Sequence, residues 1–336
     1  MNKRITPSRT AALLGSLALG GTLLAGCGQA VTPTATELPG KAAETIQNCG
    51  RTLSFGAVPQ RAVAMTPGQS ELMVKLGLAD KVVAEAQTKG GQLVPELKAS
   101  GKVKQLSDQM PPSREVLLGV SPDFVYSPTG YEFTAEQGFA SIEQLKQAGA
   151  ESYIATAGCM ERRSSAEVKD LLTDIENIGA VFGAGEQAKA VRGEAAEALS
   201  RVEKAVAGKE QPSVVELFVE GNTMAAIGAG IEYDMIKTAG GKNVFNPSDP
   251  AFAKFFSAVI SPETLVQKNP DVIVFTTLDK AHEDATRAFL QEKFPEVAAV
   301  KNGRMAAIDS DDVMPGTWGN IRAVEGIAKA LHPDAF

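Results

Sequence analysis

The chain has 336 residues, of which 44% are apolar and 22% are charged, and its formal net charge is −7. This length exceeds one typical domain and suits two domains of about 150 residues each, with the composition of a soluble globular protein. The negative net charge argues against a nucleic-acid partner.

The N-terminus has the pattern of an export signal. A basic start is followed by the uncharged apolar run 11–26, which is too short and too glycine-rich for a membrane span. The run ends in Leu-Ala-Gly-Cys at 24–27, which resembles the bacterial lipobox. The resemblance implies that residues 1–26 are a signal peptide and that Cys27 is lipidated. An ordinary signal peptide followed by a chance cysteine is the alternative.

Residues 27–48 lack apolar periodicity and are rich in Thr, Ala, Pro and Gly, which predicts a lipid-anchored flexible tether. We therefore expect an extracytoplasmic protein on the outer face of the cell membrane. Two further cysteines remain, Cys49 and Cys159, and an exported protein favours a disulfide between them. Such a bridge would stabilise the fold by ~4 kcal/mol in the chain-entropy model. The alternative is two buried free thiols.

From residue 61 onward, short apolar runs alternate with stretches of helical periodicity, which predicts βαβ units and a parallel sheet. The strands expected in the first half are 61–65, 81–86, 123–127 and 151–157, and the helices are 68–80, 113–120 and 134–149.

A helix over 164–184 is predicted by a capping box at Ser164 and Glu167, followed by apolar residues at helical spacing. The βαβ rhythm then resumes. The helices expected there are 186–207, 231–241, 261–268, 282–292 and 320–332, and the strands are 213–219, 271–277 and 304–309.

The second half repeats the first in two places. "SREVLLGVSPDFVYS" at 113–127 aligns with "SPETLVQKNPDVIVF" at 261–275, so that Asp123 matches Asp271. A second match pairs Glu71 with Asp234. Convergence of unrelated βαβ units would explain one match but not both. The repeats therefore predict two similar α/β lobes, with a ligand cleft between them beyond the carboxyl ends of the strands.

Several segments resemble the periplasmic-binding family of ABC importers, and most closely its branch that binds iron-siderophores, haem or cobalamin. They are "RAVAMTPGQSELMVKLGLADKVV", "PSREVLLGVSPDFVYS", "AGGKNVF", "SPETLVQKNPDVIVF" and "NIRAVEGIAKALHP". The resemblance implies two Rossmann-like lobes joined by a single long α-helix. We assign residues 49–163 to the N-terminal lobe, 164–184 to the connecting helix and 185–336 to the C-terminal lobe.

The resemblance also implies a function and partners. The protein would capture a ferric siderophore and deliver it to a membrane permease, as a monomeric carrier and not an enzyme, with no cofactor or metal of its own. In this family one acid at the tip of each lobe docks onto permease arginines, and the matching residues are Glu71 and Asp234. Two solvated acids near helix N-termini are the alternative.

Apolar, aromatic and basic residues near strand ends are candidates for the ligand cleft, because a large, partly anionic chelate would use both area and positive charge. The candidates are Met65, Met110, Tyr126, Tyr131, Arg162, Arg163, Tyr233, Phe256, Met314 and Trp318, with Glu220, Asn222 and Phe255 placed similarly. Each could instead belong to the core.

Other ligands and functions remain open. Haem, bound through Tyr or Met, and cobalamin are alternatives to a siderophore. A free-metal binder would need more histidines than His282 and His332. A secreted α/β enzyme is another class, but the sequence contains no G-x-S-x-G motif, no P-loop and no complete G-x-G-x-x-G motif. A surface adhesion protein is the remaining class.

Overall fold

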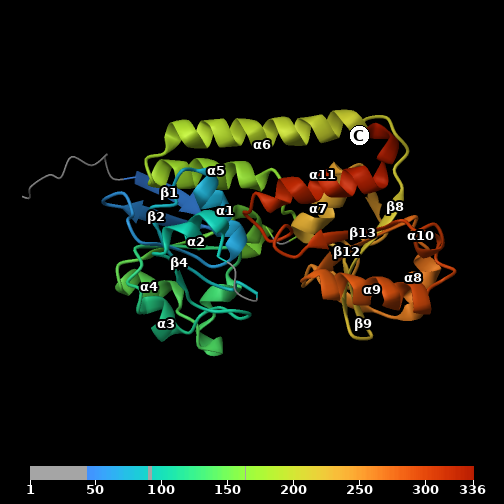
Figure 1. Cartoon of the computed structure of the whole chain (residues 1–336), viewed down its shortest axis with the longest axis horizontal. Coiled ribbons are helices and arrows are strands. Elements are labelled where there is room, and N and C mark those ends of the chain that lie inside the picture. Colours follow the sequence, from blue (N-terminus) through green and yellow to red (C-terminus); the bar gives the residue numbers. More distant parts are fainter. Residues whose placement is uncertain (1–43, 90–92, 163) are drawn as a thin grey trace, which may run out of the picture. The chain divides into compact units, whose positions relative to one another are not determined.

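The computed structural model describes residues 44–89, 93–162 and 164–336. The predicted signal peptide, Cys27, most of the tether and Arg163 lie outside these residues. Within them, no helix combines the length and apolar character that crossing a membrane requires. All of the described residues belong to one compact unit (Figure 1).

The first lobe is built on a five-stranded parallel sheet with the order β5-β4-β3-β6-β7. Both faces of this sheet are covered, so that its inner strands β3 and β6 are buried along their whole length. Its strands are β3 (Ala62–Ala64), β4 (Val82–Glu85), β5 (Lys104–Gln105), β6 (Phe124–Ser127) and β7 (Glu151–Ile154). Its helices are α1 (Pro67–Lys75), α2 (Pro95–Ser100), α3 (Arg114–Leu118) and α4 (Ile142–Gln147). Short 3-10 turns are η1 (Tyr131–Phe133), η2 (Ala135–Gln137), η3 (Thr156–Gly158) and η4 (Met160–Arg162).

An antiparallel hairpin of β1 (Glu44–Asn48) and β2 (Arg51–Phe55) precedes this sheet. The Asn48 side chain is hydrogen-bonded to both backbone groups of Ile154, at 2.7 and 2.9 Å. The predicted tether was therefore too long, since residues 44–48 already belong to the folded body. The predicted helix 134–149 was also too long, because its first half forms 3-10 turns and only α4 is α-helical.

The second lobe has a mixed sheet with the order β11-β9-β8-β12-β13, and β10 pairs with the start of β8. Strands β8, β12 and β13 are parallel, whereas β9 runs antiparallel to both β8 and β11. The strands are β8 (Ser213–Glu220), β9 (Thr223–Ile227), β10 (Lys242–Asn243), β11 (Ser257–Ile260), β12 (Val272–Thr277) and β13 (Met305–Asp309). The helices are α7 (Gly230–Thr238), α8 (Pro262–Lys268), α9 (Lys280–Lys293), α10 (Ala298–Lys301), α11 (Gly319–Leu331) and η5 (Pro333–Ala335).

The structure confirms the internal repeat. The two aligned acids make equivalent hydrogen bonds. Asp123 accepts from the backbone N–H groups of Gln60 and Arg61, just before β3, at 2.7 and 2.8 Å. Asp271 accepts from the backbone N–H and the hydroxyl of Ser213, at the start of β8, at 2.9 and 2.7 Å. Both acids thus hold the start of the central strand of their sheet.

The backbone repeats as well. Ser121 and Asn269 are aligned residues, and both adopt positive φ, 47° and 40°, directly before a proline. The strands that follow, β6 and β12, each lie next to the central strand of their sheet.

The helix that links the lobes is α6 (Gly185–Val206) and not residues 164–184, so that prediction was wrong. The N-terminal part of α6 contacts α1 of the first lobe, where Lys75 lies 2.9 Å from Glu194. Its C-terminal part packs on α11 of the second lobe, and Arg201 lies 3.6 Å from Glu325. Figure 1 shows α6 above both α5 and α11.

The preceding helix, α5 (Asp170–Val181), packs beside α6 and against the first lobe. The expected capping box at Ser164 and Glu167 does not form. Asp170 instead accepts a hydrogen bond from the Glu167 backbone at 3.0 Å, so residues 164–169 remain a turn before α5 begins.

Candidate functional site

The lobes meet at the segment between β13 and α11, residues 310–318, which we call the interlobe loop. Two buried side chains brace it from within. The amide of Asn320 donates to the carbonyls of Asp312 and Met314, both at 2.8 Å, and the Thr317 hydroxyl donates to Met314 at 3.2 Å. The loop therefore has a fixed shape before it contacts the other lobe.

Three side chains of the first lobe hold this loop. Tyr126, at the end of β6, donates its hydroxyl to the Gly316 carbonyl at 2.6 Å, and Gln69 of α1 donates to the Pro315 carbonyl at 2.8 Å. Lys89, which follows β4, lies 2.5 Å from the Ser310 hydroxyl and 2.6 Å from the Asp311 carboxylate. The carboxyl ends of the first sheet are thus joined to the second lobe by direct polar contacts.

An ion pair outside the loop joins the same two lobes. Arg322 of α11 makes a bidentate contact with Glu71 of α1, and the second of its hydrogen bonds is 2.9 Å long. The same guanidinium binds Asp312 at 2.7 Å. These hydrogen bonds raise the pKa of Arg322 above its usual value, Glu71 contributing most. Glu71 is partly exposed, which is compatible with the predicted docking role, but its carboxylate already has an arginine partner.

Asp234 is much less accessible than its predicted docking role requires. Only 7% of the residue is exposed, and its carboxylate accepts a hydrogen bond from the Val168 backbone at 2.9 Å. The contact anchors the segment before α5 onto α7. Buried acids need such partners, so Asp234 serves the structure and is not free to bind a permease arginine.

Two predicted cleft residues of the first lobe are core residues. Met65 and Tyr126 are fully buried, since Met65 packs in the apolar core and Tyr126 is covered by the interlobe loop. Arg162 is committed to Asp170, with contacts of 2.8 and 2.9 Å. These three are therefore not available as an open ligand surface in this structure.

Met110 and Tyr131 are exposed at 54% and 47%; Tyr131 follows β6, and Met110 lies in the segment after β5, a strand that the sequence did not predict. The Tyr131 ring packs edge-on against Phe139 at a centroid distance of 5.7 Å. These two side chains expose apolar and aromatic area in the loops after strands of the first sheet.

The second lobe places its candidates in three separate regions. Met314 and Trp318 belong to the interlobe loop, where the ammonium of Lys75 lies 3.9 Å from the centroid of the Trp318 ring. Phe256 precedes the edge strand β11 and packs against Phe255 in a tilted arrangement, with the ring centroids 4.4 Å apart. Tyr233 is half-buried on α7. The structure brings the first two to the lobe boundary and leaves the other two elsewhere on the second lobe.

Sequence reasoning missed Lys89, Gln69 and two acids at the strand ends. Glu132, 3% exposed, accepts hydrogen bonds from the hydroxyls of Ser127 and Thr129 at 3.0 and 2.7 Å, and burial raises its pKa. Burial likewise raises the pKa of Glu85 at the end of β4. A hydroxyl-rich segment directly after a strand was the available signal for Glu132.

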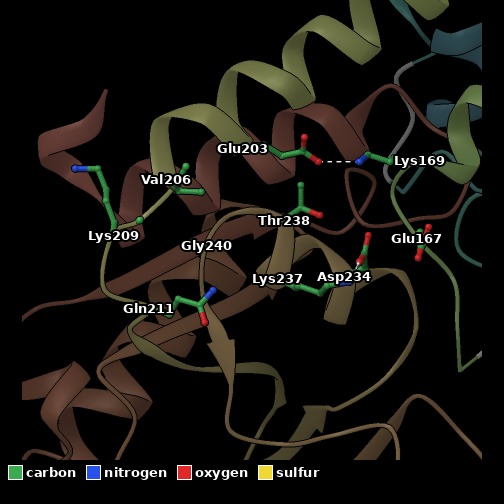
Figure 2. A pocket seen from close by; sticks show the side chains of 12 residues that line it. Glu167, Lys169, Glu203, Val206, Lys209, Gln211, Asp234, Lys237, Thr238 and Gly240 are labelled. Atoms are coloured by element: carbon green, nitrogen blue, oxygen red, sulfur yellow. Dashed lines mark hydrogen bonds and ion pairs between the residues drawn. The ribbon is translucent and has the colours of Figure 1, made fainter.

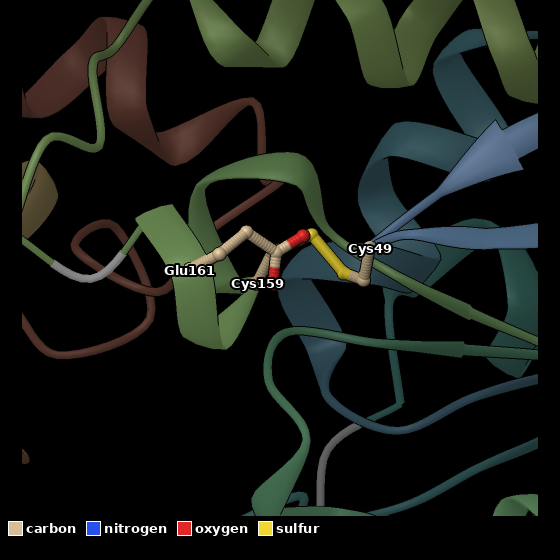
Figure 3. A group of neighbouring side chains, drawn as sticks. All are labelled: Cys49, Cys159 and Glu161. Atoms are coloured by element: carbon tan, nitrogen blue, oxygen red, sulfur yellow. A yellow bond between two sulfur atoms is a disulfide. The ribbon is translucent and has the colours of Figure 1, made fainter.

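Cys49 and Cys159 are joined by a disulfide with a Cα–Cα distance of 5.2 Å. The carboxylate of Glu161 lies beside it, and these three make the one group of potential metal ligands among the described residues (Figure 3). Because the two sulfur atoms are bonded to each other, they are not available as thiolate ligands.

A pocket of about 380 Å³ lies between the end of α6, the end of α7 and the segment before α5 (Figure 2). Its lining is polar and balanced in charge. Lys169 pairs with Glu203 at 2.8 Å, and Lys237 lies 3.4 Å from Asp234. The pocket is distinct from the interlobe loop, and four of its charged side chains form these two ion pairs.

Comparisons with known proteins agree with this architecture. The family model described as "Periplasmic binding protein" matches residues 63–311. An uncharacterized ABC transporter substrate-binding lipoprotein of Bacillus subtilis (strain 168), YvrC, is 25% identical over 98% of this chain and 99% of its own length.

Two solved structures are similar in fold. One, described as an ABC-type Fe3+-hydroxamate transport system from Saccharomonospora viridis, has a TM-score of 0.68 and 21% identity, covering 85% of this chain and 98% of its own. The other, a periplasmic heme binding protein from Pseudomonas aeruginosa, has a TM-score of 0.66 and 21% identity, covering 83% and 94%. Since the family model spans well over half of the sequence and the two-lobe fold agrees with it, the chain belongs to the periplasmic binding protein family.

Proposed function

We propose that this protein is the substrate-binding lipoprotein of an ABC importer, which captures a ferric siderophore outside the cell membrane and delivers it to the permease. The family match over residues 63–311 carries the proposal. The relative from Bacillus subtilis, which spans the whole chain and is named for this role, supports it. On this proposal the protein is a carrier and not an enzyme.

An iron chelate is favoured as the ligand by the side chains at the carboxyl ends of the first sheet. Met110 and Tyr131 expose polarizable and aromatic area there. The structural neighbour from a Fe3+-hydroxamate transport system supports the same class. Haem is the second candidate, favoured by the neighbour described as a heme binding protein.

A retention experiment tests the ligand class. The mature protein is incubated with ferric hydroxamate and ferric catecholate siderophores, haem or cobalamin, and the absorption spectrum of the protein fraction is recorded after gel filtration. We expect a ferric siderophore to remain bound in a one-to-one ratio. Retention of haem or cobalamin alone would move the assignment to that ligand, and retention of none by a folded protein would contradict the proposal.

Docking to the permease is assigned to Glu71 alone. Its partly exposed carboxylate lies at the lobe boundary, and pairs between carboxylate and arginine set register and speed encounter more than they add affinity. A permease arginine would compete with Arg322 for this carboxylate.

A further inference from the structure

Gly316 of the interlobe loop fills a slot in the first lobe that only a glycine fits. Its φ is +72°, and a Cβ there would lie 2.5 Å from the Tyr126 hydroxyl and would overlap Ala155. A residue with a side chain would be strained by this backbone conformation and excluded by its neighbours. The slot is thus shaped for a stretch of backbone that the other lobe provides.

One wall of this slot is a carboxyl group with an unpartnered oxygen. Asp174 of α5 is fully buried, and its Oδ1 accepts from the Tyr153 hydroxyl at 2.7 Å and from the backbone and hydroxyl of Thr156 at 2.8 and 2.6 Å. Its Oδ2 has no hydrogen-bond partner among the residues that the structure describes. This oxygen would lie 3.2 Å from a Cβ on Gly316, so it faces the inserted loop.

No cation compensates this carboxyl group in the described part of the chain. The ionisable groups that act on it are Tyr126 from β6, Tyr153 from β7 and Asp170 from its own helix. On the packed helix α6, Arg192 is paired with Glu176, and at the loop Lys89 is paired with Asp311. Burial raises the pKa of Asp174 to about 7.

We propose that Asp174 is a proton-linked switch for the contact between the lobes, holding the interlobe loop when neutral and releasing it when charged. Insertion of Gly316 removes water from Oδ2, which disfavours the carboxylate, whereas withdrawal of the loop restores that water. Withdrawal also frees the Tyr126 hydroxyl, which can then donate to the carboxylate.

The direction of the pH effect follows from linkage. Because the joined state raises the pKa of Asp174, joining the lobes takes up a proton, and lower pH favours the joined state. Raising the pH through the neutral range should therefore release the loop. The switch acts on the contact between the lobes, whichever ligand the protein binds.

Trp318 is the only tryptophan of the chain and reports on this contact, because its ring lies under Lys75 of the first lobe. The experiment records its emission maximum and its quenching by acrylamide in the ligand-free mature protein from about pH 5 to about pH 9. We expect a red shift and stronger quenching as the pH passes through neutrality. The absence of any transition in this range would overturn the proposal.

Three variants separate the switch from other titrations. Asp174→Asn, which cannot acquire charge, should keep the low-pH signal throughout, whereas Glu176→Gln on the same helix and Glu216→Gln in the second lobe should titrate like the wild type. A transition that persists unchanged in Asp174→Asn would refute the role of this residue.

Gly316→Ala keeps the proposal testable if Asp174→Asn fails to fold. The added methyl group cannot enter the slot, so Trp318 should show the high-pH signal at every pH. Small-angle scattering of this variant should give a larger radius of gyration than that of the wild type at low pH. A Gly316→Ala protein with the wild-type signal at low pH would overturn the proposal.

Discussion

Glu71 and Asp234 occupy equivalent positions in the repeat, yet their surroundings give them different roles. The Glu71 carboxylate is partly exposed and binds Arg322 across the lobe boundary, whereas that of Asp234 is buried against the Val168 backbone. Sequence alignment of the halves finds equivalent backbone positions, but exposure depends on which segment covers each lobe, and the turn before α5 covers only the second.

Replacing Glu71 by Gln should abolish uptake while leaving ligand affinity unchanged, because the docking charge is lost and the cleft is not. The free energy of unfolding should fall by less than about 1 kcal/mol, since the ion pair with Arg322 is partly exposed. Uptake by cells and affinity of the purified protein are the two measurements. Asp312→Asn is the matched control, because it removes a contact of the same arginine but keeps Glu71; an equal loss of uptake in both variants would contradict the docking role.

Two neighbouring acids of the second lobe have raised pKa values: Glu216 on β8, which is buried, and Glu232 on α7, which is half-buried. Burial raises the pKa of Glu216 to about 7, and burial together with the neighbouring Glu216 charge raises that of Glu232 well above its usual value. In the unfolded chain both titrate near ~4.3. Between the pKa values of the unfolded and the folded states, the folded protein therefore binds more protons than the unfolded chain. The free energy of unfolding should fall as the pH rises through this window.

Glu216→Gln should flatten this dependence and stabilise the protein at alkaline pH relative to the wild type. Urea unfolding at mildly acidic and mildly alkaline pH measures the effect. Glu115→Gln, on the exposed side of α3, should leave the wild-type dependence unchanged. A wild-type stability that increases with pH over the window would show that the pair is not buried as described.

At the scale of the elements, close packing of α5 on α6 fixes the start of the linking helix. Gly179 of α5 touches Ala188 of α6, and a Cβ on Gly179 would overlap the Ala188 methyl group. Gly193, further along α6, has open space around it. Packing therefore requires a glycine at position 179 but not at position 193.

Gly193→Ala should stabilise the protein by about 0.5–1 kcal/mol, since alanine restricts the unfolded chain and fits the helix. Gly179→Ala should destabilise it by ~1–3 kcal/mol through overpacking. Thermal and urea unfolding compare the two. Equal effects of both substitutions would mean that α5 and α6 are not packed as described.

The sequence predicted the elements whose periodicity is local and failed where tertiary contacts decide. Apolar spacing predicted α6 and the parallel strands β3, β4, β6, β7, β8, β12 and β13, whereas the two-residue polar strands β5 and β10 were missed. The repeat follows from aligned residues such as Asp123 and Asp271. The antiparallel strands β9 and β11 were missed, because "TMAAI" and "SAVI" are short and lack strict alternation. The linking helix was misplaced because α5 and α6 have similar apolar patterns, and only packing shows which one crosses between the lobes.

The site was less predictable than the fold. Trp318 and Met314, which were predicted to line the ligand cleft, lie in the interlobe loop, but Tyr126 is buried because this loop covers it. That covering is a contact between residues 190 positions apart, and no local pattern encodes it. Lys89 was missed for the same reason.

At the scale of the whole molecule, the disulfide ties the N-terminal hairpin to the end of the first sheet across 110 positions. The double substitution Cys49→Ser and Cys159→Ser should lower the free energy of unfolding by up to ~4 kcal/mol. The native fold should persist, because Asn48 and Arg51 also hold the hairpin to β7. Urea unfolding with and without a reductant measures the effect: the reductant should lower the stability of the wild type but not that of the double variant. Free thiols at both positions in protein from the exported fraction would contradict the bridge.

On the proposed function, the two lobes bind an iron complex and carry it to a permease. Fluorescence of Trp318, at the boundary between the lobes, is the most direct test, because a bound ferric chromophore quenches a nearby indole. We predict saturable quenching by a ferric siderophore at one-to-one stoichiometry, with unchanged affinity in the Glu71→Gln protein. A folded protein whose Trp318 emission is unaffected by ferric siderophores, haem and cobalamin alike would contradict the account.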